Sequence, residues 1–302
     1  MALIKTHCDL CGSIESAELY RGNVNDAAMS AASFYSSSRS AAGHNPIVRC
    51  KVCGLVRSSL RDDDLALSDI YTELEDCNYE AELINRKRTA NSYLGWVSQF
   101  CHQPLNLLDI GCSTGIFLSQ ARQSCWNVTG LEPSLWAANI ASRRIPGAEI
   151  IVGPLAEADF PTESFDVITL WDVLEHLPYP SEALFSLHRW LKPSGWLFLN
   201  VPNITSLPAS VLGARWMLFL REHIWYFSPH TLQALLARCG YRMTSTRTNL
   251  VWFSLGTILS RINQYHNPLS FRMTGVLMNY PPFANIPIRF PIGEITVAAQ
   301  KV

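Results

Sequence analysis

The 302-residue sequence lacks any apolar run long enough to cross a membrane, and its N-terminus has no apolar core of signal-peptide length. These two absences predict a cytoplasmic protein with no membrane partner. It also lacks a long run of like charges, and its net charge is −1, so it does not show the charge pattern of a dedicated nucleic-acid binder. With 48% hydrophobic and 16% charged residues, the chain is predicted to be globular, with one large or two modest domains.

Cysteine, in contrast, is plentiful and is arranged in a pattern. The nine cysteines include two Cys-x-x-Cys-Gly motifs, one ending at Gly12 and the other at Gly54. Each motif can bring two thiolates to one ion, and in a reducing compartment such pairs favour a metal over disulfides; redox or unpaired thiols are the alternative. We predict a structural Zn²⁺ in a module spanning residues 1–60, held by Cys8, Cys11, Cys50 and Cys53.

The stretch 106–118, NLLDIGCSTGIFL, reads as a buried strand, a glycine turn and the start of a helix. Such a turn presents backbone N–H groups and a helix N-terminus to an anionic group of a ligand. Its spacing is Gly-x-x-x-Gly, which differs from the Gly-x-Gly-x-x-Gly of dinucleotide folds, and no Lys-Ser/Thr follows as in a phosphate loop. The turn therefore argues against NAD and ATP as ligands.

Strands and helices alternate after this turn. Further strands are predicted at 127–132, 148–153, 164–171, 196–201, 241–249 and 295–300, so the fold class is α/β. Glu132 ends the second strand of the series, at a position from which a carboxylate can accept hydrogen bonds from both ribose hydroxyls of a nucleoside. Trp171 and Asp172 end the fourth, at the edge where open α/β sheets bind ligands.

The motif Asp109-Ile-Gly-Cys-Ser-Thr-Gly115 resembles the first motif of class I S-adenosylmethionine (SAM) methyltransferases. The sequence of residues 164–178 resembles that of small-molecule members of the family. The resemblance is dense over 105–204 and looser over 8–54 and 222–240. It implies a Rossmann-like, seven-stranded, mostly parallel sheet with an antiparallel final strand. It also implies a SAM methyltransferase domain at 105–302, preceded by a helical lead-in at 61–104 over the cofactor site.

The same resemblance implies a set of cofactor-binding residues for SAM: Asp109, Gly111, Cys112, Thr114, Gly115, Glu132, Pro133, Leu155, Trp171 and Asp172. Family members usually carry an acidic residue for adenine where this chain has Pro154, so adenine is left to the backbone at 155–156, to Glu157 or to Asp159. In the lead-in, Tyr71 or Tyr79 is a further candidate for the pocket, although packing is the simpler interpretation of both.

Two segments, 203–227 and 250–291, are predicted to be lids or substrate insertions because they are rich in aromatic residues or proline. The second could instead form a dimer contact and give a homodimer. Within the first, Arg221-Glu222-His223 resembles zinc-containing methyltransferases of deoxysugar biosynthesis, which implies that Glu222 and His223 lie at the substrate and that His223 is the base. His176 is a second candidate base, and packing is the alternative for both histidines.

These features predict methyl transfer from SAM to a small-molecule acceptor, such as a sugar or a sugar nucleotide. One competing hypothesis is an RNA methyltransferase whose zinc module grips RNA through Arg49, Lys51 and Arg57. However, residues 1–60 carry only six basic residues against four acidic ones, fewer than RNA-binding ribbons usually show. The other is a non-catalytic partner subunit that keeps the SAM fold and docks another protein through the zinc module.

Overall fold

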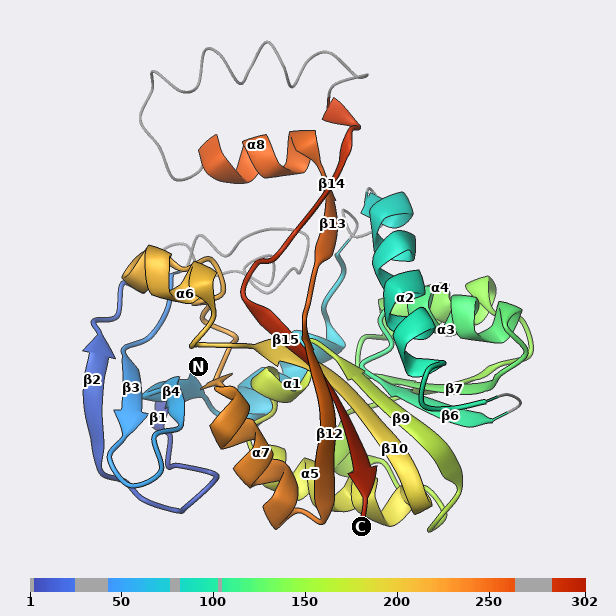
Figure 1. The fold of residues 1–302 in the computed structure, drawn as a ribbon, viewed down its shortest axis with the longest axis horizontal. Coiled ribbons are helices and arrows are strands. Elements are labelled where there is room, and N and C mark those ends of the chain that lie inside the picture. The colour runs from blue at the N-terminus through green and yellow to red at the C-terminus, as the bar shows by residue number, and fades with distance from the viewer. Residues whose placement is uncertain (1–2, 25–42, 77–81, 103–104, 264–283) are drawn as a thin grey trace.

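The computed structural model describes residues 3–24, 43–76, 82–102, 105–263 and 284–302. Its centre is a seven-stranded sheet with the strand order β12-β15-β10-β9-β6-β7-β8 (Figure 1). Strand β15 runs antiparallel to both of its neighbours, and the other adjacent strands are parallel. The predicted sheet is therefore confirmed, with these strands: β6 (Asn106–Ile110), β7 (Asn127–Glu132), β8 (Glu149–Val152), β9 (Phe165–Trp171), β10 (Leu191–Pro202), β12 (Tyr241–Thr248) and β15 (Glu294–Lys301).

The strands are apolar on both faces because helices cover both faces. Neighbouring residues of one strand enter different clusters: Leu107 and Val167 pack on one face, Leu108 and Ile168 on the other. The first face is covered by α2 (Leu83–Val97) and α3 (Ile116–Gln123), and α4 (Leu135–Arg144) packs on β7 and β8. The second face is covered by α1 (Asp64–Thr72), α5 (Pro180–Trp190) and α7 (Pro229–Arg238).

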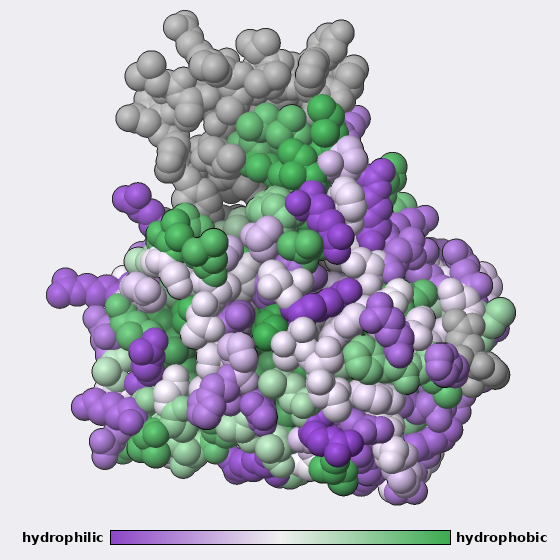
Figure 2. All heavy atoms as spheres, in the orientation of Figure 1, coloured by the Kyte–Doolittle hydropathy of each residue, from purple (hydrophilic) through white to green (hydrophobic). Residues whose placement is uncertain are grey.

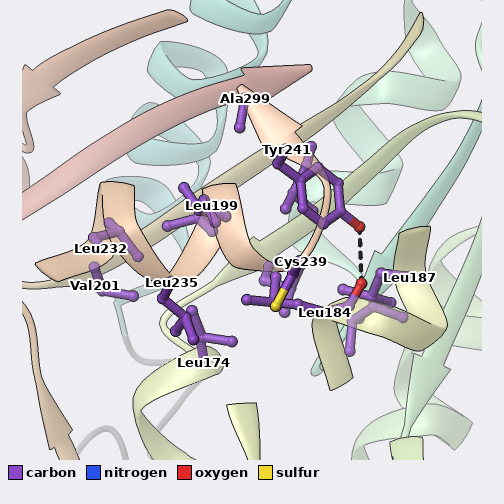
Figure 3. Packing of buried hydrophobic residues seen from close by; sticks show 14 of the residues in the cluster. Leu174, Leu184, Leu187, Leu199, Val201, Leu232, Leu235, Cys239, Tyr241 and Ala299 are labelled. Atoms are coloured by element: carbon purple, nitrogen blue, oxygen red, sulfur yellow. Dashed lines mark hydrogen bonds between the residues drawn. The ribbon is translucent and has the colours of Figure 1, made fainter. Parts of the chain in front are cut away.

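Figure 3 shows how α5 and α7 close the second face. Leu232 and Leu235 of α7 point towards Leu199 and Val201 of β10, and the Tyr241 hydroxyl donates to the Leu184 carbonyl of α5 at 3.0 Å. A capping box between Ser228 and Thr231 fixes the start of α7. This packing fixes the segment that follows β9.

The N-terminal module contains two small sheets, which lie beside the central sheet at the left of Figure 1. One pairs β1 (Leu3–Lys5) with β5 (Leu60–Asp62). The other has the order β11-β4-β3-β2, with β2 (Ser16–Tyr20), β3 (Ile47–Cys50), β4 (Val56–Ser58) and β11 (Trp225–Tyr226). Strand β11 belongs to the segment 203–227, so this part of the predicted lid is the fourth strand of a sheet otherwise formed by the N-terminal module.

The aromatic residues of that segment explain why it packs inward. Trp216, Phe219 and Tyr226 are buried against Ile47 and Val56 of the module, where water is excluded from their large apolar surfaces. The segment also contains α6 (Leu207–Leu212) and the 3₁₀ turn η6 (Gly213–Arg215). Exposed apolar residues lie on α6, where Figure 2 shows a green patch: Leu207, Val211 and Leu212.

Other elements depart from the predicted boundaries. The lead-in forms two helices, α1 and α2, and Tyr79 lies outside the described residues. Strand β10 begins at Leu191, five residues before the start predicted for this strand, with a break in register before Trp196. The segment 250–291 forms β13 (Val251–Ser254), α8 (Leu255–Asn263) and β14 (Pro287–Phe290), but its residues 264–283 lie outside the described parts. Within the described ranges, no helix combines the length and apolarity that crossing a bilayer requires.

Candidate active site and metal centre

The glycine turn after β6 has the backbone geometry that its sequence predicts. Gly111 and Gly115 have φ values of +66° and +74°, a region that favours glycine. A Cβ atom at Gly111 would lie 2.7 Å from Val173 Cγ2, and one at Gly115 would lie 2.9 Å from the Cβ of Ala141. The two glycines therefore serve both the turn itself and its close approach to neighbouring chain segments.

Glu132 closes this turn from the neighbouring strand. Its two carboxylate oxygens accept the backbone N–H groups of Ser113 at 2.8 Å and Ser134 at 3.0 Å. Burial raises the pKa of Glu132 to about 7, while the two N–H donors oppose that rise. Each oxygen keeps a lone pair beyond these bonds. The carboxylate can therefore accept hydrogen bonds from a ligand with two adjacent hydroxyl groups, as the ribose of SAM has.

Three other predicted cofactor residues point their side chains away from the turn. Asp109 is buried and accepts the Thr169 hydroxyl at 2.6 Å; burial raises its pKa to about 8. The thiol of Cys112 is buried in the core, and the Thr114 hydroxyl accepts a bond from Arg144. These side chains already have partners or burial within the protein, so the contact of residues 109, 112 and 114 with SAM stays a prediction, for which the backbone groups at 112 and 114 are left.

The end of β9 supplies the next part of the site. Trp171 stacks on Tyr93 of α2, with ring centroids 4.2 Å apart and an interplanar angle of 11°. Asp172 follows with a φ of 58°, is exposed, and accepts a hydrogen bond from Asn200 Nδ2. Through this ring stack, helix α2 packs against the residue that ends β9.

The remaining cofactor candidates lie along the same edge. Pro133 follows Glu132, and Leu155 lies in the 3₁₀ turn η4 (Leu155–Glu157) after β8, partly buried. Of the acidic candidates for adenine, Glu157 is exposed, whereas Asp159 pairs with Arg189 at 3.0 Å. An ion pair as exposed as that of Asp159 is weak, so Glu157, Asp159 and the backbone at 155–156 all stay predictions for adenine.

Two histidines that are 47 positions apart in the sequence lie side by side. The rings of His176 and His223 are 4.7 Å apart at 84°, and their nitrogens lie within 4.8 Å of a Glu175 carboxylate oxygen. His176 Nδ1 lies 3.0 Å from the Tyr71 hydroxyl and 3.1 Å from the Glu222 carbonyl. A carbonyl only accepts, so Nδ1 carries the proton and Nε2 of His176 offers its lone pair.

Burial sets the charge state of this cluster, which we call the Glu-His cluster (Glu175, His176, Glu222 and His223). Burial lowers the pKa of His176 to about 4 and holds the pKa of His223 well below its ordinary value. Burial also raises the pKa of Glu222 to about 7 and that of Glu175 well above its ordinary range. Both imidazoles are therefore neutral at pH 7 and able to accept a proton.

Several atoms of the cluster are buried without a hydrogen-bond partner among the residues that the structure describes: Glu175 Oε2, Glu222 Oε2 and His223 Nδ1. Unsatisfied buried polar atoms cost free energy unless something binds to them. Glu175, His176 and His223 also have the residue types and spacing to hold a metal ion. The cluster is thus arranged to receive a ligand, whether an acceptor group, a proton or a cation.

Glu175 and Tyr71 are site residues to which the sequence analysis gave no firm role. A signal for Glu175 was present, since the sequence contains the dipeptide Glu-His twice, at 175–176 and 222–223. The structure brings these two dipeptides together, and the Ile224 N–H donates to the Glu175 carbonyl at 2.9 Å. No such signal marks Tyr71, because its contact with His176 spans 105 positions.

The four cysteines of the two knuckles converge as predicted. Their sulfur atoms all lie within 4.8 Å of one another, with Cys8 Sγ 3.3 Å from Cys53 Sγ and Cys11 Sγ 3.5 Å from Cys50 Sγ. Gly12 and Gly54 have φ values of +72° and +79° and donate their N–H groups back to the carbonyls of the first cysteines. Four thiol ligands in a closed group fit tetrahedral Zn²⁺.

The backbone around the second knuckle also favours a thiolate. Burial raises the pKa of Cys50, but the N–H groups of Cys53 and Val52, together with the thiols of Cys11 and Cys53, outweigh it and bring the value to about 6.

The surroundings of Arg57 are different from those expected of an RNA-binding residue. Arg57 is only 2% exposed and donates to Thr6 Oγ1 at 3.2 Å, because β4 carries it into the interior. One of the three cations proposed to grip RNA is therefore inaccessible to a phosphate.

Comparison with known proteins gives one family and a set of partial relatives. A family model described as "Methyltransferase domain" matches residues 82–246, more than half of the chain. The Paracidovorax citrulli protein named ubiquinone biosynthesis O-methyltransferase is 29% identical over 136 residues, covering 41% of this chain and 56% of that protein. A mitochondrial protein of the same name from Candida albicans is 34% identical over 142 residues, covering 43% of this chain and 41% of that one.

The chain thus spans about half the length of these curated relatives. Among solved structures, a Haloferax volcanii methyltransferase in complex with a methyltransferase activator has a TM-score of 0.54 at 14% identity, covering 74% of this chain and 93% of that chain. A Bacillus halodurans methyltransferase has a TM-score of 0.51 at 17% identity, with 70% and 99% covered. These likenesses show a shared fold.

Proposed function

The chain belongs to the methyltransferase-domain family and is a SAM-dependent methyltransferase, and on that premise we propose that it methylates a hydroxyl group of a small molecule. One observation carries the proposal: the buried Glu-His cluster, with its two neutral histidines, lies just after the strand end that bears Trp171 and Asp172 in the chain. A hydroxyl acceptor must lose a proton as it is methylated, and this cluster has nitrogens to take it. The names of the relatives, all O-methyltransferases, support the same acceptor chemistry.

The residues at the carboxyl edge would hold the cofactor. Glu132 would accept the ribose hydroxyls, and the backbone at 111–115 would bind the amino acid part of SAM, with Asp109 supporting the turn. Leu155 and the backbone beside it would bind adenine, and Trp171 and Asp172 would border the methyl group. Bound SAM supplies a methyl group activated by its positive sulfur. The protein's task is then mainly to align the acceptor oxygen with that methyl group.

Within the cluster, we assign the base to His223, with His176 as its neighbour. His176 donates its Nδ1 proton to the Glu222 carbonyl, which fixes its ring and leaves Nε2 facing away from that bond. His223 Nδ1 is buried with its lone pair available. A proton taken from the acceptor by His223 is stabilised by the carboxyl groups of Glu175 and Glu222, which share the same buried space.

We propose that residues 1–60 form a structural zinc module, in which Cys8, Cys11, Cys50 and Cys53 hold Zn²⁺. A closed four-thiolate site has no open coordination position, so the ion shapes the fold and takes no part in methyl transfer. On the same proposal, residues 61–104 are the lead-in and 105–302 the catalytic domain, with the segment 203–227 and the described parts of 250–291 on the acceptor side.

A sugar or sugar nucleotide is the second candidate acceptor. Its support is the resemblance of Arg221-Glu222-His223, together with the four-cysteine module, to deoxysugar methyltransferases. In that case the acidified group could be a sugar carbon next to a ketone, and His223 would again take the proton. The two candidates differ in the acceptor atom and agree on the base.

An acceptor panel tests the proposal. The protein, with labelled SAM, is offered a catechol, a sugar nucleotide, a primary amine and an RNA transcript, and methylated products are identified by mass spectrometry. O-methylation that falls by about 100-fold or more in His223→Ala is the expected result. His230→Ala is the control, because His230 lies on the exposed side of α7.

Other outcomes would contradict the proposal. Turnover of His223→Ala at the wild-type rate would exclude His223 as the base. Methylation of RNA alone would favour the RNA hypothesis, and absence of saturable SAM binding would favour a non-catalytic scaffold.

A further inference from the structure

We propose that the four-cysteine module positions the Glu-His cluster, with Asp9, Asp62 and Arg221 as the positioning residues. The proposal rests on the proposed function, since it assigns these residues a role in methyl transfer through His176 and His223. Its basis is that two separate sets of hydrogen bonds, which we call routes, and one buried ion pair connect the N-terminal part of the chain to the segments that carry the two Glu-His dipeptides.

The first route starts inside the first knuckle. Asp9 lies between Cys8 and Cys11, and its carboxylate accepts the backbone N–H of Ser181 at 2.8 Å and the Ser181 hydroxyl at 3.0 Å. Ser181 is in the first turn of α5, whose own N-cap residue makes no side-chain cap. Asp9 therefore supplies the cap from the metal loop, and α5 begins only four positions after His176.

A cation fastens the same loop from another helix. Arg238, in the last turn of α7, donates to the carbonyls of Asp9 and Leu10, each at 2.8 Å. These bonds satisfy two carbonyls of the knuckle with a charged donor, which makes them stronger than neutral hydrogen bonds. The first knuckle is thus held between α5 and α7, the two helices that close one face of the central sheet.

The second route leaves the second knuckle through β4. Cys50 N–H donates to the Leu55 carbonyl across the knuckle, and β4 then pairs with β11. The Ser58 N–H donates to the Ile224 carbonyl at 2.8 Å, while the Ile224 N–H donates to the Glu175 carbonyl at 2.9 Å. Ile224 immediately follows His223. One peptide segment therefore connects the module on one side to the first Glu-His dipeptide on the other.

A buried ion pair reinforces the second route. Arg221 donates to the two carboxylate oxygens of Asp62 at 2.7 and 3.2 Å, and the two side chains are 3% and 2% exposed. Asp62 ends β5, the strand that pairs with β1 of the module and continues two residues beyond the module, and Arg221 lies two positions before His223. Loss of either partner would leave a buried charge unpaired, so the segment that carries Glu222 and His223 would have to move to hydrate it.

The SAM site has different anchors. The glycine turn and Glu132 are held by Ser113, Ser134 and Arg144, none of which belongs to the module. Loosening the module should therefore displace the histidines and leave SAM binding in place. A displacement of about 1 Å at the reacting group can reduce a rate by about 100-fold.

The test compares Asp9→Ala and Arg221→Lys with Arg189→Ala, which removes an exposed ion pair from the same helix α5. The measurements are zinc content, SAM affinity by calorimetry, kcat and KM for the acceptor, and the ring resonances of His176 and His223 by NMR across pH. We expect bound zinc and SAM affinity within twofold of wild type, kcat lower by about 10- to 100-fold, and histidine pKa values shifted up from their buried range. Asp9→Asn keeps an oxygen acceptor for Ser181 and should recover most of kcat.

The proposal would be overturned if both variants had the same histidine resonances and the same kcat as Arg189→Ala. If a variant does not fold, wild-type protein with its zinc chelated gives the same NMR readout. Unchanged histidine resonances there, or loss of SAM binding together with the fold, would also overturn the proposal. If His223→Ala is fully active while zinc removal still shifts the histidine resonances, then the proposed base is wrong and the positioning stands.

Discussion

Replacing Glu132 with glutamine is the sharpest perturbation of the cofactor site. The carboxylate accepts the Ser113 N–H at 2.8 Å and the Ser134 N–H at 3.0 Å, one on each oxygen. A glutamine side chain has the same shape but has an NH₂ group in place of one oxygen, so one N–H group would face another donor. The substitution therefore disturbs the support of the turn and also removes one acceptor for a ribose hydroxyl.

The size of the effect follows from hydrogen bonds to a charged group, which contribute about 1.5–3 kcal/mol each. Loss of one such bond to the ribose corresponds to a weakening of SAM binding by about 10- to 100-fold. Calorimetric titration with SAM measures this, and Glu149→Gln, at the exposed start of the neighbouring strand β8, is the matched control. SAM affinity within twofold of wild type in Glu132→Gln, with the fold intact, would refute the ribose assignment.

Three further substitutions, one of them with a matched control, test the four-cysteine site, the glycine turn and the Glu-His cluster. Cys11→Ser should lower bound zinc from one ion per chain towards none, measured by elemental analysis of protein purified without chelator. Gly115→Ala should lower the free energy of unfolding by about 1–2 kcal/mol because of the positive φ at this position. It should lower it further because the new Cβ would lie 2.9 Å from the Cβ of Ala141. Gly147→Ala has a similar φ of +80° but no atom within 4 Å, so denaturant titration should show a smaller loss. Because burial raises the pKa of Glu222 to about 7, kcat should fall as pH drops through 7 and the carboxylate is protonated, and a pH–rate profile of Glu222→Gln should lack this limb.

The sequence predicted the central sheet well because most of its strands contain a short apolar run next to a turn or a helix. The edge that we propose for the cofactor followed from the same local pattern, since Gly111 and Glu132 lie at strand ends and Gly115 immediately precedes α3. The four cysteines could be paired for a similar reason: each knuckle is complete within five residues. Features encoded within one turn or one strand can be read without knowing the tertiary structure.

The position of the segment 203–227 could not be predicted in this way. Its strand β11 is only two residues long and pairs with β4, which precedes it by more than 160 positions. No hydrophobic period marks so short a strand, and the aromatic residues of the segment fit a lid as well as a buried packing layer. The contact of Tyr71 with His176 and the ion pair of Arg221 with Asp62 likewise depend on distant parts of the chain meeting in the fold.

The electrostatics of the Glu-His cluster bear on the choice of acceptor. Burial brings the pKa of His176 to about 4 and keeps that of His223 well below its ordinary value, so both are weak bases. A general base works best when its pKa lies near the operating pH, and a weaker base needs an acceptor with a more acidic proton. A phenol, with a pKa of about 10 as in tyrosine, meets this need better than an aliphatic sugar hydroxyl or a carbon acid. The ionised form of Glu222 can strengthen either histidine, and its pKa of about 7 makes that form available at neutral pH. On the proposed function, the burial that makes the histidines weak bases therefore favours a phenol over an aliphatic hydroxyl as the acceptor, and we expect its methylation to depend on the ionisation of Glu222.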